Sequence, residues 1–202
     1  MTNASSSSDA VLSHSQQSYS KVAIFFHWLI AILIIGQLAG GLIMVRFLSK
    51  GSSLKFELYQ YHKSFGILIL SLSVLRLIWR LTHKPPALPL TMPGWEKTLA
   101  SMTHFIFYFF MLAIPLVGWA MVSVSPLGIS TYLFEIVRLP HLPFWEGAQD
   151  PAALEKQFKF VHEYLAFATI ALLVLHIGAA LKHHFHDCDS VLTRMLPFVR
   201  TR

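Results

Sequence analysis

The chain has 202 residues, of which 54% are hydrophobic and only 13% are charged, and its mean hydropathy is +0.55. Because soluble domains carry about a quarter charged residues, this composition argues against a soluble domain and predicts an integral membrane protein. In so apolar a chain the net charge of +6 indicates basic flanks that meet anionic membrane lipid, and we expect no nucleic-acid partner.

The chain begins with a polar, Ser-rich segment over residues 1–18, MTNASSSSDAVLSHSQQS. It cannot bury a core, so we expect it to be disordered. It does not resemble a signal peptide, because no basic segment precedes the first apolar run and that run is too long. We expect residues 19–198 to form one membrane domain, followed by a short tail over residues 199–202.

The first two predicted membrane spans cover residues 22–45 and 58–81. The first has no formally charged residue, carries His27 near its start, and contains glycines that allow close packing against a helix or a planar ligand. The second is less apolar because Lys63, Arg76 and Arg80 lie inside it, and His62 is near its start.

Two further spans are predicted over residues 99–123, with His104 near the start, and 158–182. The connection between them contains TYLFEIVRL, residues 131–139. We expect this stretch to lie flat on the membrane as a short amphipathic helix, or to act as a lid. The basic tail after the fourth span is expected at the membrane interface. The fold class is therefore an all-α, integral membrane four-helix bundle.

The fourth span carries two histidines on one face, His162 and His176, fourteen residues apart. At 1.5 Å per residue they are about 21 Å apart along a helix. Ala166 and Ala180 follow them by one turn, which leaves room for a large flat ligand. Ionisable residues inside a membrane usually mark function. This pattern predicts two haems stacked across the membrane, held without a Cys-x-x-Cys-His attachment because the chain has a single cysteine.

The depth of each histidine predicts which ones share a haem. Nine of the sixteen Lys and Arg residues fall on the side of the termini and seven on the other, so we expect both termini to be cytoplasmic. The inner layer then holds His27, His176 and His104, and the outer layer holds His62 and His162. We predict the pairs His27 with His176 and His62 with His162, although topology alone leaves His104 with His176 open.

Four stretches resemble the prokaryotic cytochrome b561 family: YSK and FFHW, YHKSFGILILSLSVLRLIWR, THFIFYFFMLAIPLVGW, and VHEYLAFATIALLVLHIGAALKHHF. The resemblance runs from Tyr19 to about Phe198. It implies a multi-pass cytochrome of the bacterial inner membrane, with two haem b groups between the helices, bound by His27, His62, His162 and His176. Some members resemble superoxide oxidases, which implies electron transfer from superoxide, or another one-electron donor, to ubiquinone.

Other polar residues allow two interpretations, a functional role or an ordinary structural role at the membrane interface. Arg76 and Arg80 either bind haem propionates or anchor the helix end at the interface. Lys63 and Lys159 either steer anionic superoxide or are plain interfacial lysines. His183 either binds a quinone carbonyl or relays a proton, or it belongs to a solvated pair at the helix end. Together with the spare His104, we assign His183 and both lysines to substrate binding.

With two histidines on each iron, neither haem keeps an open position, so we expect an oxidoreductase that exchanges electrons at the haem edges. An alternative is a haem-bearing anchor or relay subunit for a dehydrogenase or hydrogenase. A histidine-lined metal transporter is disfavoured because we find neither inverted repeats nor broken helices.

Overall fold

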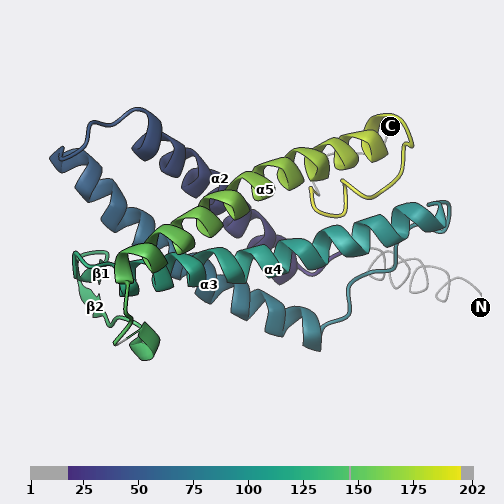
Figure 1. Cartoon of the computed structure of the whole chain (residues 1–202). Coiled ribbons are helices and arrows are strands. Elements are labelled where there is room, and N and C mark those ends of the chain that lie inside the picture. Colours follow the sequence, from purple (N-terminus) through teal and green to yellow (C-terminus); the bar gives the residue numbers. More distant parts are fainter. Residues whose placement is uncertain (1–17, 146, 197–202) are drawn as a thin grey trace, which may run out of the picture.

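In a computed structural model that describes residues 18–145 and 147–196, four long helices dominate the chain (Figure 1). Each is long and apolar enough to cross a membrane, which confirms the predicted all-α membrane bundle. The expected disorder of residues 1–18 lies outside the described residues except for Ser18. The helices are α2 (Lys21–Arg46), α3 (Ser53–Thr82), α4 (Gly94–Val124) and α5 (Pro151–Phe185).

Capping residues explain why α3 and α5 begin before the predicted spans 58–81 and 158–182, whereas α4 begins before its predicted span 99–123 without a side-chain cap. Ser52 accepts a hydrogen bond from the backbone N–H of Lys55 at the start of α3. Asp150 does the same for Ala153 at the start of α5, where Pro151 occupies the first turn. Such caps satisfy free N–H groups at a helix start, so the helices begin in polar sequence before the apolar cores.

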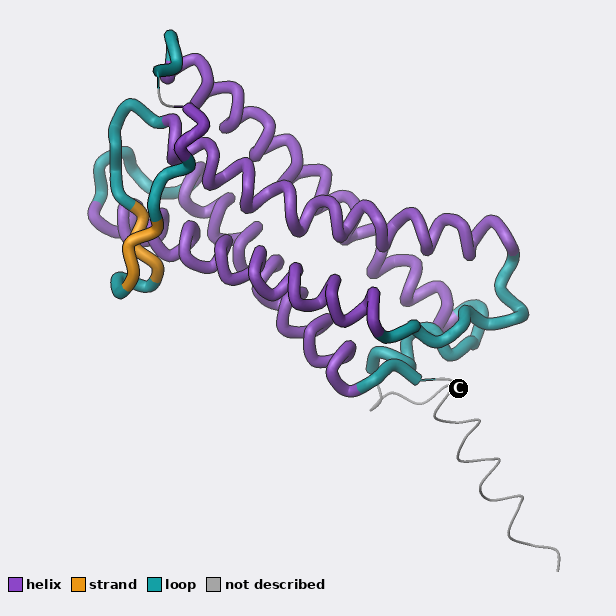
Figure 2. Tube along the Cα trace, turned by 90° about the horizontal axis from the view of Figure 1, so that it is seen from below, coloured by secondary structure: helices purple, strands orange, loops and turns teal. Residues whose placement is uncertain are grey.

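The helices run up and down, so the bundle has two distinct ends (Figure 2). The terminal end holds the start of α2, the α3–α4 connection and the tail after α5. The hairpin end holds the α2–α3 connection and the α4–α5 connection. Consecutive helices pack most closely, α2 with α3, α3 with α4, and α4 with α5. Residues near the start of one helix therefore lie at the same depth as residues near the end of the next.

The outer surface of the bundle is apolar. Phe105 is 74% exposed and Leu175 is 69% exposed, whereas few apolar side chains of the described residues are fully buried. In water such a surface would be unfavourable, but a hydrocarbon solvent covers it at no cost. The bundle thus contacts membrane lipid, and among the described residues the few buried side chains are a mixture of apolar ones, such as Ile30 and Met111, and polar ones, such as Ser64 and Ser73.

The α4–α5 connection forms a β-hairpin, so the amphipathic helix predicted over residues 131–139 is wrong. Strand β1 (Thr131–Leu133) pairs antiparallel with β2 (Val137–Leu139). Phe134 and Glu135 turn the chain with positive φ angles of 50° and 63°. The buried Ser64 of α3 fixes the hairpin: its Oγ accepts from the Phe134 N–H at 3.0 Å and lies 3.2 Å from the Tyr132 carbonyl oxygen. A tertiary contact therefore overrides the local pattern.

The tail after α5 folds back over the terminal end of the bundle. The indole N–H of Trp28 in α2 donates to the Met195 carbonyl at 2.8 Å. Arg194 donates to the Ala87 carbonyl in the α3–α4 connection. The described part of the tail, to Leu196, is therefore held by two other parts of the chain, α2 and the α3–α4 connection.

Candidate functional site

One histidine pair lies near the hairpin end. His62 of α3 and His162 of α5 face each other with ring centroids 6.2 Å apart. The ring of His162 is oriented by the Ile114 carbonyl of α4, 3.1 Å from its Nδ1. The Nδ1 atom of His62 is buried and has no hydrogen-bond partner among the described residues. The pair therefore offers one fixed imidazole and one unsatisfied imidazole.

Glycines make room for this pair. A Cβ atom at Gly118 of α4 would lie 3.1 Å from Cε1 of His162, and one at Gly41 of α2 would lie 3.6 Å from Cε1 of His62. One turn before Gly41 in α2, the side chain of Gln37 donates to the His62 backbone carbonyl at 2.7 Å. Gln37 was not singled out in the sequence, although an amide inside an apolar span is a readable signal.

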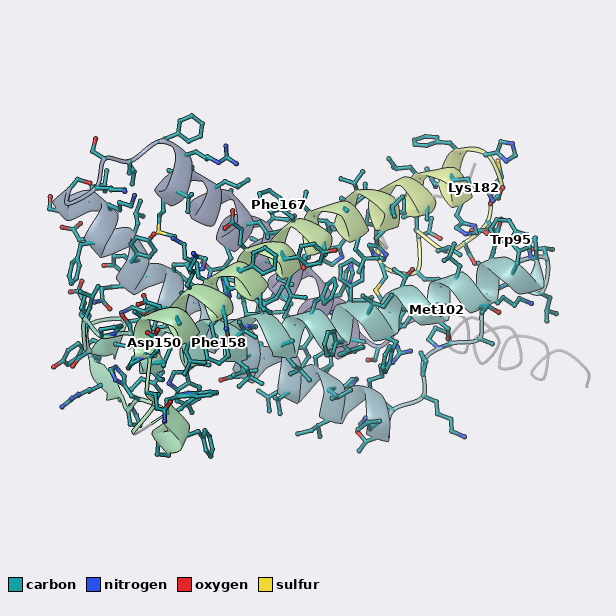
Figure 3. All side chains as sticks on the ribbon, viewed as in Figure 1. Trp95, Met102, Asp150, Phe158, Phe167 and Lys182 are labelled. Atoms are coloured by element: carbon teal, nitrogen blue, oxygen red, sulfur yellow. The ribbon has the colours of Figure 1, made fainter. Side chains whose placement is uncertain are left out.

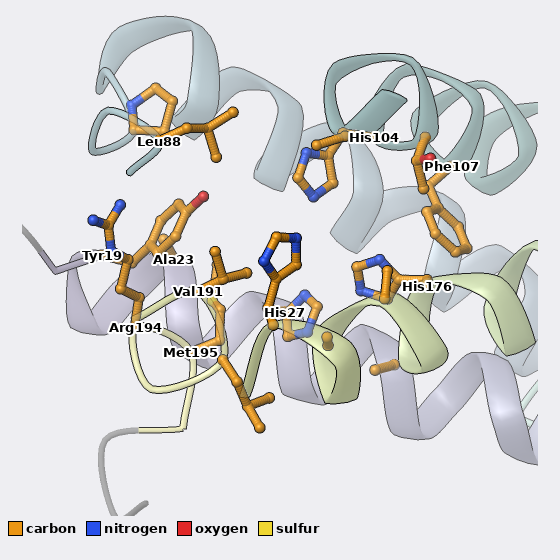
Figure 4. A pocket seen from close by; sticks show the side chains of 18 of the residues that line it. Tyr19, Ala23, His27, Leu88, His104, Phe107, His176, Val191, Arg194 and Met195 are labelled. Carbon is orange, nitrogen blue, oxygen red and sulfur yellow. The ribbon is translucent and has the colours of Figure 1, made fainter. Parts of the chain in front are cut away.

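Three histidines converge near the terminal end (Figure 4). The ring of His176 in α5 lies 6.3 Å from that of His27 in α2 and 6.1 Å from that of His104 in α4, measured between centroids. All three line a cavity of about 1490 Å³ that also touches α3 and the tail. The structure therefore brings together the three residues that the sequence placed in one layer.

The spacing of the pairs fits two imidazoles on opposite sides of one metal ion. Metal–imidazole bonds of about 2 Å place the two ring centroids roughly 6 Å apart. The pairs His62–His162 and His27–His176 both have this separation. His104–His176 has it too, so ring distance alone leaves the choice at the terminal end open, as the sequence did.

Two arginines of α3 line the same cavity. Arg76 donates to Nδ1 of His27 at 3.3 Å, and both Arg76 and Arg80 lie over the Tyr108 ring, 5.5 Å and 5.9 Å from its centroid. Within residues 18–145 and 147–196 no carboxylate forms an ion pair with either arginine. The cavity thus holds two cations suited to an anionic ligand. Tyr108 was missed in the sequence, although it follows His104 by one turn on the same face.

His183 lies at the rim of this cavity near the end of α5. It is buried, as is His184, so the solvated pair considered from the sequence is not what the fold contains. Nδ1 of His183 lies 2.8 Å from Oδ2 of Asp189. Beside it, hydrogen bonds from Lys182 and then His186 lower the pKa of Asp187, which follows the helix. Glu96, near the start of α4, completes this cluster, and the sequence analysis had not selected it.

The two lysines assigned to substrate steering lie at the hairpin end. Lys63 follows His62 in α3 and is half-buried, whereas Lys159 is exposed one turn before His162 in α5. Each lysine therefore lies close in sequence to one histidine of the His62–His162 pair.

Comparisons with a family model and with individual proteins agree on one family. A family model described as prokaryotic cytochrome b561 matches residues 18–198. Cytochrome b561 homolog 2 and homolog 1 of Escherichia coli K12 are 34% and 31% identical, covering 89% of this chain and 92% and 97% of their own lengths. A protein named probable superoxide oxidase CybB, from Yersinia pestis, is 31% identical over 90% of this chain and 97% of its own. The chain therefore belongs to the prokaryotic cytochrome b561 family, a family of membrane electron-transfer proteins that bind haem b.

Proposed function

We propose that the chain holds two haem b groups, one at each end of the bundle, and passes electrons between them. His62 and His162 would hold one group, and His27 and His176 the other. The observation that carries this proposal is the presence of facing imidazoles, with centroids 6.2 Å and 6.3 Å apart, at both ends. The bound haem supplies one-electron redox chemistry, and two histidines per iron leave no open position for oxygen.

The residues around each pair position and shield the cofactor. Arg76 and Arg80 would bind the haem propionates at the terminal end, because guanidinium groups match carboxylates. Neither arginine has another anionic partner among the described side chains. The carbonyl of Ile114 orients His162 at the other end. Apolar side chains and lipid would exclude water from the space between the two haem groups. Electron exchange with donors and acceptors would then take place at the haem edges nearest the two ends of the bundle.

We further propose that superoxide donates electrons at the hairpin end and that ubiquinone accepts them at the terminal end. Support comes from the name of the Yersinia relative, from Lys63 and Lys159 beside the hairpin-end pair, and from a large cavity with His104 and His183 in its lining. The charge distribution of the sequence supports an inner-membrane orientation with cytoplasmic termini.

Purification of the single chain tests this function. Pyridine haemochrome analysis should give two haem b per chain. Superoxide should reduce the haems, and added ubiquinone should reoxidise them with formation of ubiquinol. One haem per chain would refute the two-site arrangement. Two haems that superoxide cannot reduce, but that a dehydrogenase or hydrogenase partner can, would identify a relay subunit instead.

A further inference from the structure

Glu96 and His183 form a buried pair at the rim of the terminal-end cavity. Glu96 lies in the first turn of α4 and His183 in the last turn of α5, next to Trp95 and Lys182 in Figure 3. Their side chains are only 10% and 11% exposed, and Oε2 of Glu96 lies 3.6 Å from Nε2 of His183. Both residues line the cavity that contains His27 and His176. A ligand in the cavity can therefore reach them.

The hydrogen bond to Asp189 decides which nitrogen of His183 carries a proton. A carboxylate only accepts, so the contact of 2.8 Å with Oδ2 of Asp189 requires a proton on Nδ1. A neutral His183 then presents the lone pair of Nε2 toward Oε2 of Glu96. That oxygen is buried and has no hydrogen-bond partner in the described part of the chain. Two acceptors that face each other need a proton, or a donor ligand, between them.

A proton suits this cluster better than a metal ion. Ligand atoms of Glu96, His183 and Asp187 lie within 4.8 Å of one another, as in a cation site. However, the ammonium group of Lys182 already lies between the two carboxylates, 2.6 Å from Glu96 Oε1 and 2.8 Å from Asp187 Oδ2. A divalent ion would have to displace or repel it.

Two neighbouring charged groups are already engaged. His186 contacts Oδ1 of Asp187 at 2.9 Å, and the Arg194 guanidinium is turned to Ser190 and Ala87. Among the described atoms of this cluster, Oε2 of Glu96 and Nε2 of His183 are therefore free to exchange a proton with a ligand.

We infer that Glu96 and His183 form a proton-transfer pair for a quinone bound in this cavity, with Asp189 as the positioning residue; this rests on the quinone reduction proposed above. One quinone becomes quinol by taking up two electrons and two protons. The electrons come from two superoxide molecules, each oxidised to dioxygen. One proton leaves Nε2 of His183 and forms an O–H bond on the quinone oxygen that faces it, and the other quinone oxygen takes its proton from water at the rim of the cavity. Glu96 returns a proton to His183 and exchanges with water at the rim, where Lys182 is 43% exposed.

The test compares wild type with Glu96→Gln, Glu96→Asp and Asp189→Asn, with Glu57→Gln as the control. Glu57 is an exposed carboxylate of α3 at the hairpin end. Quinol formation driven by superoxide is measured across a pH series in water and heavy water, together with haem content and haem reduction without quinone. Haem reduction by quinol is measured as the reverse reaction.

We expect Glu96→Gln to slow quinol formation at least about 10-fold, because positioned acid–base groups contribute factors of this size or more. It should also alter the pH profile and the solvent isotope effect, while haem content and haem reduction by superoxide stay unchanged. Glu96→Asp should restore part of the rate. Asp189→Asn should lower the rate and change the solvent isotope effect, since it keeps the side-chain volume but replaces the charged acceptor that holds the Nδ1 proton of His183.

Two outcomes would overturn the pair while leaving the proposed function intact: an unchanged rate and pH profile in Glu96→Gln, or stoichiometric zinc in the wild type that Glu96→Gln loses. A wild type that neither reduces quinone nor is reduced by quinol would instead overturn the proposed function, and the proton-transfer pair with it.

Discussion

At the scale of single residues, the facing imidazoles make separable predictions about haem content. His62→Ala or His162→Ala should remove the hairpin-end haem and spare the terminal-end haem, because each substitution removes one of the two histidine ligands at the hairpin end. His27→Ala or His176→Ala should do the reverse. Haem is counted as the pyridine haemochrome, and low-temperature visible spectra identify the remaining group. His83→Ala is the control, since His83 is exposed and stacks on Trp79.

His104 decides the arrangement at the terminal end. His104→Ala should keep both haems, with at most a shifted potential. Loss of a haem in His104→Ala, with retention in His27→Ala, would show that His104 rather than His27 pairs with His176.

Gly118 makes a second prediction at this scale. A methyl group there would lie 3.1 Å from Cε1 and 3.3 Å from Nδ1 of His162, and the Ile114 carbonyl restricts the ring from moving away. Gly118→Ala should therefore displace the imidazole and weaken the hairpin-end haem, at a cost of about 1–3 kcal/mol typical of overpacking. Redox titration and haem loss on heating measure the effect.

Gly36→Ala is the matched control for Gly118→Ala. Gly36 also lies within an apolar helix, but a Cβ atom there meets no atom of the described part of the chain within 4 Å. It should leave both haems unchanged. Equal behaviour of the two variants would mean that Gly118 does not determine the position of His162.

At the scale of elements, Ser64 attaches the hairpin to α3. Ser64→Ala would leave the Phe134 N–H without its acceptor, at a cost of about 0.5–1.5 kcal/mol, the net contribution of a typical hydrogen bond. The α3 helix keeps its own backbone hydrogen bonds, so the loss of stability should be confined to the hairpin over residues 131–139. We expect faster amide hydrogen exchange and faster proteolysis there, with the helices unaffected.

Ser71→Ala serves as the control for this element. Among the described residues its hydroxyl bonds only to the Ile67 carbonyl in its own helix, so exchange in the hairpin should match wild type. Slow exchange retained in Ser64→Ala would indicate that strand pairing and the Phe65–Phe134 contact, with centroids 5.2 Å apart, suffice to hold the hairpin.

At the scale of the whole molecule, the lysines at the hairpin end should act through their summed field. If superoxide is the donor, added salt should slow haem reduction, since the Debye length is about 8 Å at physiological ionic strength. Changing Lys63 and Lys159 together to Gln should lower the rate and flatten its dependence on salt. Stopped-flow haem reduction across a salt series measures both, and reduction by a neutral quinol is the control. Identical salt slopes in both proteins would leave the lysines as membrane anchors.

The sequence by itself determined the membrane class, the four helices and the layer to which each histidine belongs. These follow from one-dimensional quantities: apolar length against bilayer thickness, and helix rise and rotation between His162 and His176. The sequence also placed His104 in the same layer as His27 and His176, where the structure has it. The alternatives for His104 stayed open because spacing along one helix does not fix the rotation of its neighbours.

Only the tertiary structure decided the features that depend on contacts between distant segments. The hairpin over residues 131–139 exists because Ser64, 70 positions before Phe134, satisfies its turn, and no local pattern encodes that bond. Glu96 and His183 are 87 positions apart and become a buried pair only when the start of α4 meets the end of α5. Burial and hydrogen bonding then select which polar residues can exchange protons, because those quantities arise from packing rather than from residue type.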